Sequence, residues 1–169
     1  MYVNDHKAKM RKAACMVITM SDTRNISTDK SGSLIVDFLE KHGHMVTSRD
    51  IVADEKNAID KKITAGINDP NIDVILTNGG TGIANRDVTI ETVKPLLDKE
   101  IPGFGEIFRS LSYLEDIGSA AILSRAIAGI ANQTVIFAMP GSSGAVRLAM
   151  ERLILPELSH VIHEINKDT

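Results

Sequence analysis

The residues best suited to chemistry in this sequence form a glycine-rich stretch that ends in an aspartate. Gly79, Gly80 and Gly82 follow an apolar run, and Asp87 precedes a segment with helical spacing. Glycines allow a tight turn that brings backbone N–H groups close to a ligand, and the start of a helix supplies further free N–H groups. This order favours phosphate binding, with Asp87 as a candidate Mg²⁺ ligand.

Two familiar nucleotide-binding patterns are excluded for this stretch. The dinucleotide fingerprint needs a glycine three positions after Gly82, where the chain has Asn85. The Walker pattern needs a lysine directly after the glycines, and none is present. A purely structural interpretation stays open, because glycine turns often join a strand to a helix and Asp87 can serve only as the N-cap of that helix.

Composition is typical of one soluble globular domain. The 169 residues are 43% hydrophobic and 24% charged, and the formal net charge is −3. This balance lacks the basic footprint of a nucleic-acid-binding protein, so we expect no nucleic-acid partner. No apolar run approaches the roughly 18 residues that a membrane span needs, so we expect no membrane partner either. The lone Cys15 excludes an internal disulfide, which fits a reducing, cytoplasmic compartment.

Short apolar runs alternate with segments of helical spacing along the chain. We expect strands at 13–20, 45–52, 72–76 and 134–139, and helices within 34–39, 58–67, 88–97, 104–111 and 146–165. This alternation is typical of an α/β domain with a mostly parallel sheet and helices on both faces. Residues 125–130 are a candidate for one further strand, antiparallel at an edge of the sheet.

Two prolines and the N-terminal residues modify this pattern. We expect Pro95 to distort or shorten its helix and Pro156 to bend the terminal helix, because proline lacks the N–H that a helix interior needs. Residues 1–12 are largely polar and basic. We interpret them as a flexible segment that precedes a single domain at 13–169.

Polar residues gather where the expected strands end, and the carboxyl ends of parallel strands lie at one edge of a sheet. After the first, second and last strands come Ser21, Asp22, Thr23 and Arg24, then Asp54, and finally Pro140, Gly141 and Ser142. With the glycine stretch, these loops could hold phosphates on backbone N–H groups and Mg²⁺ on carboxylates. Phosphoryl or nucleotidyl transfer needs little else, because positioning and charge neutralisation provide most of the catalysis.

Each of these residues also has a structural interpretation when it is taken alone. Asp54 can simply cap the helix that follows it, and Gly141 can simply permit a tight turn. Arg24 can be a solvated surface charge. The functional interpretation depends on all four loops meeting at one edge of the sheet.

Seven motifs in this order resemble the signature of the MoaB/Mog family of molybdenum cofactor biosynthesis proteins, and most closely its MoaB branch. They are SDTR at 21–24, DKSG at 29–32, NGGTGI at 78–83, RDVT at 86–89, PGFGE at 102–106, ILSRA at 122–126 and FAMPGS at 137–142. The resemblance implies a three-layer α/β/α domain that assembles as a homotrimer or homohexamer. It also implies Mg²⁺- and ATP-dependent adenylylation of molybdopterin, with release of pyrophosphate.

The resemblance also implies roles for individual positions. Asp87 matches an essential aspartate, and Asp54 matches a second acidic residue, so both are expected to be catalytic and to bind the metal. The positions expected to bind nucleotide are Gly79, Gly80, Thr81, Gly82, Pro140, Gly141 and Ser142. Those expected to bind molybdopterin are Ser21, Asp22, Arg24, Ser124 and Arg125.

One position departs from the family pattern, and one alternative function stays open. Asn78 stands where many relatives carry threonine, so a side-chain amide replaces a hydroxyl. The alternative is a non-catalytic protein that binds or carries molybdopterin in the same pathway. The presence of both Asp87 and Asp54 favours the enzyme, because a carrier would not need two carboxylates. The downstream molybdenum insertion protein is a candidate partner.

Overall fold

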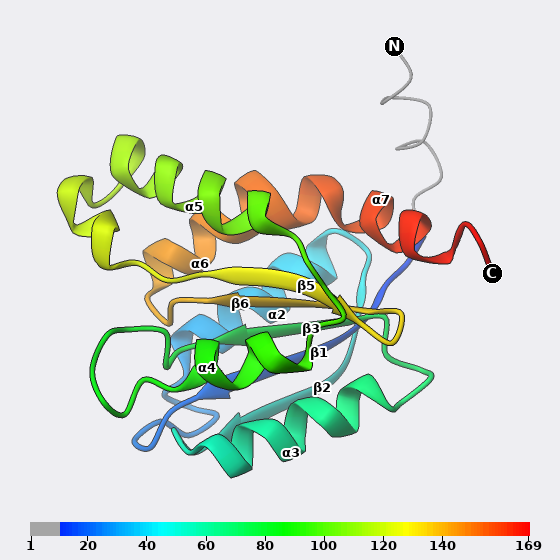
Figure 1. Cartoon of the computed structure of the whole chain (residues 1–169), viewed down its shortest axis with the longest axis horizontal. Helices are drawn as coiled ribbons and strands as arrows, with labels where there is room; N and C mark the ends of the chain where they lie inside the picture. The colour runs from blue at the N-terminus through cyan, green and yellow to red at the C-terminus, as the bar shows by residue number, and fades with distance from the viewer. Residues whose placement is uncertain (1–10) are drawn as a thin grey trace.

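The computed structural model describes residues 11–169, and a six-stranded sheet forms its centre (Figure 1). The strands are β1 (Ala14–Met20), β2 (Met45–Val52), β3 (Val74–Asn78), β4 (Lys99–Glu100), β5 (Ile127–Ala131) and β6 (Thr134–Met139). All but the last two residues of the expected flexible segment 1–12 lie outside the described residues. Within residues 11–169, no helix is both long enough and apolar enough to cross a membrane.

Helices cover both faces of the sheet and complete a three-layer α/β/α domain, as expected (Figure 1). They are α2 (Lys30–Lys41), α3 (Lys56–Ile67), α4 (Thr89–Val93), α5 (Pro102–Glu115), α6 (Ser143–Ala149) and α7 (Leu155–Asn166). Three short turns join them: the 3₁₀ turns η1 (Lys94–Leu96) and η2 (Gly118–Leu123), and the π-helical turn η3 (Met150–Ile154). Helices α2, α5, α6 and α7 pack on one face, and α3 and α4 pack on the other.

Four strands of the sheet are parallel, and two antiparallel pairings extend it on one side. The order is β2-β1-β3-β6-β5-β4, with β2, β1, β3 and β6 parallel to one another. Strand β5 is antiparallel to β6, and β4 is antiparallel to β5. The expected antiparallel strand near 125–130 is therefore confirmed as β5. The sequence pattern did not reveal β4, because it consists of two exposed charged residues.

Proline affects the two helices differently. Pro95 shortens its helix as expected, since α4 ends at Val93 and the 3₁₀ turn that contains Pro95 follows. The terminal helix is interrupted next to Pro156, where the π-helical turn η3 separates α6 from α7. Pro156 itself lies in the first turn of α7, where a missing N–H is tolerated. The irregularity lies just before it, in the π-helical turn η3.

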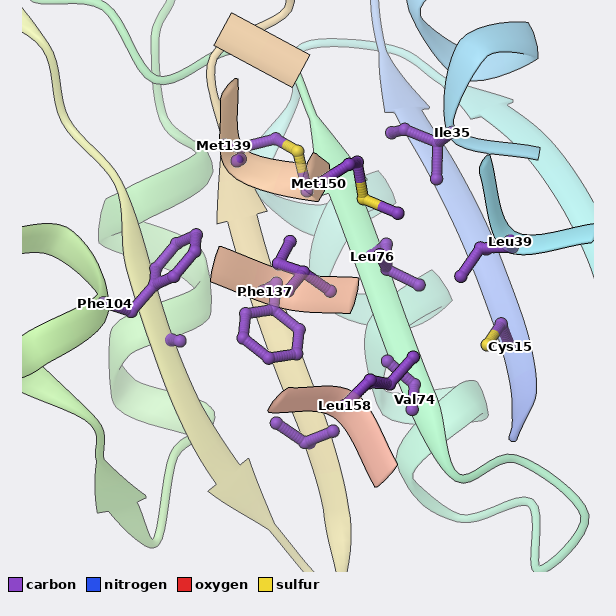
Figure 2. Close-up of a cluster of buried hydrophobic side chains, with 14 of the residues drawn as sticks. Cys15, Ile35, Leu39, Val74, Leu76, Phe104, Phe137, Met139, Met150 and Leu158 are labelled. Carbon is purple, nitrogen blue, oxygen red and sulfur yellow. The ribbon is translucent and has the colours of Figure 1, made fainter. Parts of the chain in front are cut away.

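The strands feed two separate apolar cores because successive side chains of a strand point to opposite faces. In β3, Val74 and Leu76 belong to the core under α2, α5, α6 and α7, while the residue between them faces α3 and α4. Figure 2 shows the larger core, where the rings of Phe104 and Phe137 meet edge to face with centroids 5.2 Å apart. Cys15 is buried in the same core, and burial raises its pKa to about 12, so it is not a reactive thiol.

Candidate functional site

The carboxyl ends of the four parallel strands lie on one side of the sheet, as the sequence predicted. Strand β1 lies between β2 and β3, so the connection from β1 to β2 runs to one side and the connection from β2 to β3 crosses back over β1 to the other side. Such a switch point is where open α/β sheets bind ligands. The glycine loop, residues 79–88, lies on this side of the molecule together with η2 (Figure 1, left). A pocket of about 490 Å³ opens between them.

Most residues predicted for the site line this pocket. They are Ser21, Arg24, Gly79, Gly80, Thr81, Gly82, Asp87, Ser124, Arg125, Pro140 and Gly141. Asp22, Asp54 and Ser142 are not among the lining residues. Ser142 instead caps helix α6, since its hydroxyl oxygen accepts from the Ala145 N–H at 3.2 Å. The pocket also has an apolar wall that the sequence did not predict, formed by Ile117, Ala120 and Leu123 around η2.

The glycine loop turns sharply because its first two residues have left-handed backbone angles. Gly79 and Gly80 have φ values of 95° and 65°. A Cβ on Gly79 would collide with the Met20 carbonyl oxygen, and a Cβ on Gly80 would collide with the Thr89 hydroxyl. The Gly79 N–H donates to the Met139 carbonyl at 3.1 Å, so the ends of β1, β3 and β6 meet here. Thr89 donates to the Gly79 carbonyl through its hydroxyl, at 2.9 Å, and to the Gly80 carbonyl through its N–H, at 3.0 Å.

Arg24 joins the loop after β1 to the loop after β6. Its guanidinium donates to the Ser31 hydroxyl at 2.7 Å and to the Gly141 carbonyl at 3.4 Å. Arg24 is exposed, as the interpretation of it as a surface charge expects, but it also links these two loops. Gly141 in turn lies against the glycine loop, because a Cβ there would be 3.1 Å from the Cα of Gly79.

The carboxylates of Asp54 and Asp87 flank the glycine loop. A Cβ on Gly80 would be 3.0 Å from Asp54 Oδ1, and a Cβ on Gly82 would be 2.5 Å from Asp87 Oδ2. Neither aspartate caps a helix, so both capping interpretations are wrong: the N-cap positions of α3 and α4 are the following residues and make no side-chain cap. Asp87 Oδ2 accepts from the Ala84 N–H at 3.0 Å within the loop. Asp54 Oδ1 is buried and has no hydrogen-bond partner among residues 11–169.

Among the carboxylates around the glycine loop, Asp54 is the one whose negative charge is unfavourable. Burial raises its pKa, and the negative charges of Asp22 and Asp87 raise it further, although Arg86 opposes them. The pKa of Asp22 is lowered instead, because its carboxylate accepts from the Asp54 N–H at 2.9 Å and pairs with Arg86. A partly buried carboxylate whose pKa is raised beside a cleft is a candidate functional group.

The structure contains no ready-made metal cage in its described part. Among residues 11–169, no group of three or more His, Cys, Asp or Glu side chains is placed to hold a metal ion. Mg²⁺ commonly binds through one or two carboxylates and completes its shell with water and substrate phosphates. The unpartnered oxygen of Asp54 and the carboxylate of Asp87 fit that arrangement, since both border a loop suited to phosphates.

Arg125 contacts the glycine loop from the segment between η2 and β5. Its Nε donates to the Thr81 carbonyl at 2.9 Å, and its Nη2 donates to the Gly82 carbonyl at 2.6 Å. It also pairs with Glu91 on α4. The sequence pointed to Arg125 as a site residue but gave no sign of Glu91, which lies 34 residues away along the chain.

A buried carboxylate beneath the site was not singled out from the sequence. Asp29 caps α2 by accepting from the Gly32 N–H at 3.0 Å, and it also accepts from the Thr19 hydroxyl at 2.8 Å and from Arg49 at 3.2 Å. Burial raises the pKa of Asp29, but these donors outweigh it and leave the pKa lowered. The DKSG motif could have revealed this role. An N-cap aspartate accepts a hydrogen bond from the backbone N–H three residues later, and here that residue is Gly32.

Asn78 connects this buried carboxylate network to the glycine loop. Its amide oxygen accepts from the Ser31 hydroxyl at 2.9 Å, and its amide nitrogen donates to the Thr19 hydroxyl at 2.9 Å. A side-chain amide can accept a hydrogen bond through its oxygen and donate one through its nitrogen, so it can link two hydroxyl groups. The departure from threonine at position 78 therefore has a structural role in joining β3 to β1 and α2.

Comparison with known proteins agrees with this geometry. Residues 16–160 match the family described as "Probable molybdopterin binding domain". Molybdenum cofactor biosynthesis protein B of Bacillus subtilis (strain 168) is 58% identical over 169 residues, which are 99% of each chain. The chain belongs to the MoaB/Mog family of molybdenum cofactor biosynthesis proteins.

Solved structures of MoaB proteins share the fold. A crystal structure of a molybdenum cofactor biosynthesis protein B superposes with a TM-score of 0.91 at 58% identity, covering 93% of this chain and 98% of the other. The tungsten cofactor synthesizing protein MoaB from Pyrococcus furiosus superposes with a TM-score of 0.79 at 39% identity, covering 92% of this chain and 98% of the other. The expected resemblance to the MoaB branch is confirmed.

The MoaB/Mog motifs divide into site and core. The NGGTGI and RDVT motifs form the glycine loop, and SDTR, ILSRA and FAMPGS supply the segments around it. The PGFGE motif begins α5 and serves packing: Phe104 is buried, and a Cβ on Gly105 would be 2.5 Å from the Ala126 carbonyl oxygen. Only part of the family signature therefore lies at the pocket.

The charge on Asp54 should destabilise the free protein near neutral pH. A carboxyl whose pKa is raised by folding binds its proton more tightly in the folded state, so stability falls as pH rises from the unfolded pKa through the folded pKa. We expect Asp54→Asn to raise the melting temperature at pH 7 and to lose this advantage below about pH 4, near the ordinary aspartate pKa.

Thermal melts from about pH 3, below the ordinary aspartate pKa, up to about pH 8 test this expectation. The matched control is Asp37→Asn, an exposed position on α2, which should leave the melting temperature almost unchanged. A lower melting temperature for Asp54→Asn at pH 7 would show that the carboxylate stabilises the free protein.

Proposed function

We propose that this protein catalyses the Mg²⁺- and ATP-dependent adenylylation of molybdopterin and releases pyrophosphate. The observation that carries the proposal is a glycine loop with open donors between two carboxylates. Within residues 11–169, the N–H groups of Gly80, Thr81 and Gly82 have no acceptor, while Asp54 and Asp87 stand on either side. Free N–H groups bind phosphate oxygens, and paired carboxylates suit a divalent cation.

The chemistry needs no nucleophile from the protein. A phosphate oxygen of molybdopterin forms a bond to the α-phosphorus of ATP, and the bond from that phosphorus to the bridging oxygen breaks, so that pyrophosphate leaves. Asp54 and Asp87 would hold Mg²⁺, which neutralises charge between the reacting phosphates. The protein binds the phosphates on loop N–H groups and presents both substrates to one another in a single pocket.

The apolar wall supports the placement of substrates around this loop. Ile117, Ala120 and Leu123 offer a surface for a flat ring system, and Arg24 and Ser124 add polar groups at the pocket. The pocket therefore combines donors for phosphates with apolar surface for a base or a pterin. We further propose that the product passes to a molybdenum insertion protein.

The Asp87→Asn substitution separates a catalyst from a carrier. Asparagine keeps the size of the side chain and can still accept from the Ala84 N–H, so the melting temperature should change little. The charge that attracts Mg²⁺ is lost, so adenylyl transfer should fall by about 100-fold or more while molybdopterin still binds. Product formation and pyrophosphate release measure the rate, and fluorescence titration with molybdopterin measures binding.

Two results would contradict the proposed role of Asp87. Full activity of Asp87→Asn would remove it from the metal site. Wild-type protein that binds molybdopterin but forms no adenylylated product with ATP and Mg²⁺ would instead identify a carrier.

The Gly80→Val substitution tests the phosphate loop itself. The left-handed angle and the nearby Thr89 hydroxyl leave no room for a branched side chain, so the loop must distort. MgATP affinity measured by calorimetry should fall about tenfold or more, which is about 1.4 kcal/mol. Gly103→Val is the control, because a Cβ at that helical position meets open space. Equal affinity in a folded Gly80→Val protein would exclude the loop from the nucleotide site.

A homotrimer or homohexamer is the assembly that we propose. Six apolar residues on α5, on η2 and on the turn between them are exposed by roughly half or more of their surface: Ile107, Tyr113, Leu114, Ile117, Ile122 and Leu123. Ile117 and Leu123 also line the pocket, so an interface formed here would lie beside it, and exposed apolar residues gathered on neighbouring elements are typical of a protein interface. Light scattering should give three or six times the 18.3 kDa of one chain, and Ile122→Glu should lower that mass. A wild-type monomer at micromolar concentration would refute the assembly.

A further inference from the structure

We propose that Arg125 and Glu91 form a clamp that fixes the glycine loop for phosphate binding, and that Arg125 is a positioning residue rather than a ligand of the substrate. This inference rests on the proposed function, which makes the loop the phosphate site. It assigns a role to Glu91, and it gives Arg125 a role other than the substrate binding expected from the sequence.

Two residues hold the carbonyls of the first four residues of the loop. Thr89 accounts for the carbonyls of the first two loop residues, as described above. Arg125 accounts for the next two: Nε donates to Thr81 at 2.9 Å, and Nη2 donates to Gly82 at 2.6 Å. Nη2 also lies 3.4 Å from the carbonyl of Asp87, at the far end of the loop. A single guanidinium therefore bridges both ends of the loop.

Fixing these carbonyls fixes the direction of the open N–H groups. Every peptide bond among residues 11–169 is trans, so each carbonyl points opposite to the N–H of the next residue. With the carbonyls of Thr81 and Gly82 turned to Arg125, the N–H groups of Gly82 and Ile83 must point away from it. A loop rich in glycine would otherwise sample many backbone conformations. Arg125 therefore fixes the direction of the Gly82 donor, while Thr89 fixes those of Gly80 and Thr81 through the carbonyls that precede them.

Glu91 completes the clamp from helix α4. Both of its carboxylate oxygens face Arg125, one of them 3.2 Å from Nη2, and the hydrogen bond from Arg125 lowers the Glu91 pKa. Glu91 is not among the residues that line the pocket. The pair orients the planar guanidinium fork and neutralises its charge. Arg125 lines the pocket, but each hydrogen bond that its guanidinium donates within residues 11–169 goes to the glycine loop or to Glu91.

The Glu91→Gln substitution distinguishes the two roles of Arg125 by the sign of its effect. If Arg125 positions the loop, losing its partner should weaken MgATP binding about tenfold, which is about 1.4 kcal/mol. If Arg125 binds phosphate directly, Glu91→Gln frees its charge, and MgATP should bind as tightly as in wild type or more tightly. That second result would overturn the proposal. Calorimetry well below the melting temperature keeps stability out of the comparison.

Two further variants control this measurement. Glu100→Gln also removes an exposed, ion-paired glutamate, because Glu100 Oε2 lies 3.9 Å from Lys94 Nζ. Glu100 lies on β4 and not in the glycine loop. This variant should leave MgATP affinity unchanged, and an equal loss there would overturn the proposal. Arg125→Lys keeps the charge but cannot bridge several carbonyls, so it should weaken binding as Glu91→Gln does. Wild-type affinity in Arg125→Lys would show that charge alone matters and would also overturn the clamp.

Hydrogen exchange in the free protein tests the clamp without any ligand. The amides of Ala84, Asp87 and Thr89 are hydrogen-bonded within the glycine loop, so they report whether it stays closed. Glu91→Gln should accelerate their exchange and leave the strand amides unchanged. Unaltered exchange would overturn the clamp. Wild-type protein that binds no MgATP would refute the proposed function alone, because the exchange result stands without it.

Discussion

The structure depends on a backbone contact at Gly79, where the ends of β1, β3 and β6 meet with no side chain between them. The Gly79 N–H binds the Met139 carbonyl, a Cβ would strike the Met20 carbonyl, and Gly141 packs against its Cα. Any side chain there would separate the strand ends and the loops that they carry. This close approach merges the loops into one pocket, so phosphate donors, carboxylates and apolar surface face the same space.

Two carboxylates near this contact, Asp29 beneath it and Asp54 beside the glycine loop, differ in how well their negative charge is compensated. The buried carboxylate of Asp29 has a donor on every side, and Asn78 extends that network to the start of the glycine loop. Asp54, by contrast, has a buried oxygen without a partner and a raised pKa. Folding free energy from the cores and the polar network offsets the unfavourable charge at the pocket. Such unfavourable charge is typical of sites that bind a cation or react.

Much of the fold could be predicted from the chain because it depends on local periodicity. The four parallel strands and their helices appear where apolar runs and helical spacing placed them, and Pro95 ends its helix as its missing N–H requires. The two-residue β4 had no pattern to reveal it, since pairing with β5 alone makes it a strand. The irregular turn η3 includes Arg152, whose carbonyl loses its helical partner because Pro156 has no N–H, although the sequence did not reveal that the turn would be π-helical.

The glycine loop, its two flanking aspartates and the order of the segments around it could be read from the chain, because residue type and spacing encode tight turns and strand ends. The partners of these residues could not, because they depend on the folded arrangement. Asp87 turns back into its own loop rather than capping α4, and Arg125 holds carbonyls 43 and 44 residues away while it pairs with Glu91. Such partners are set by how strands and helices pack side by side in space, and no local spacing along the chain records that arrangement.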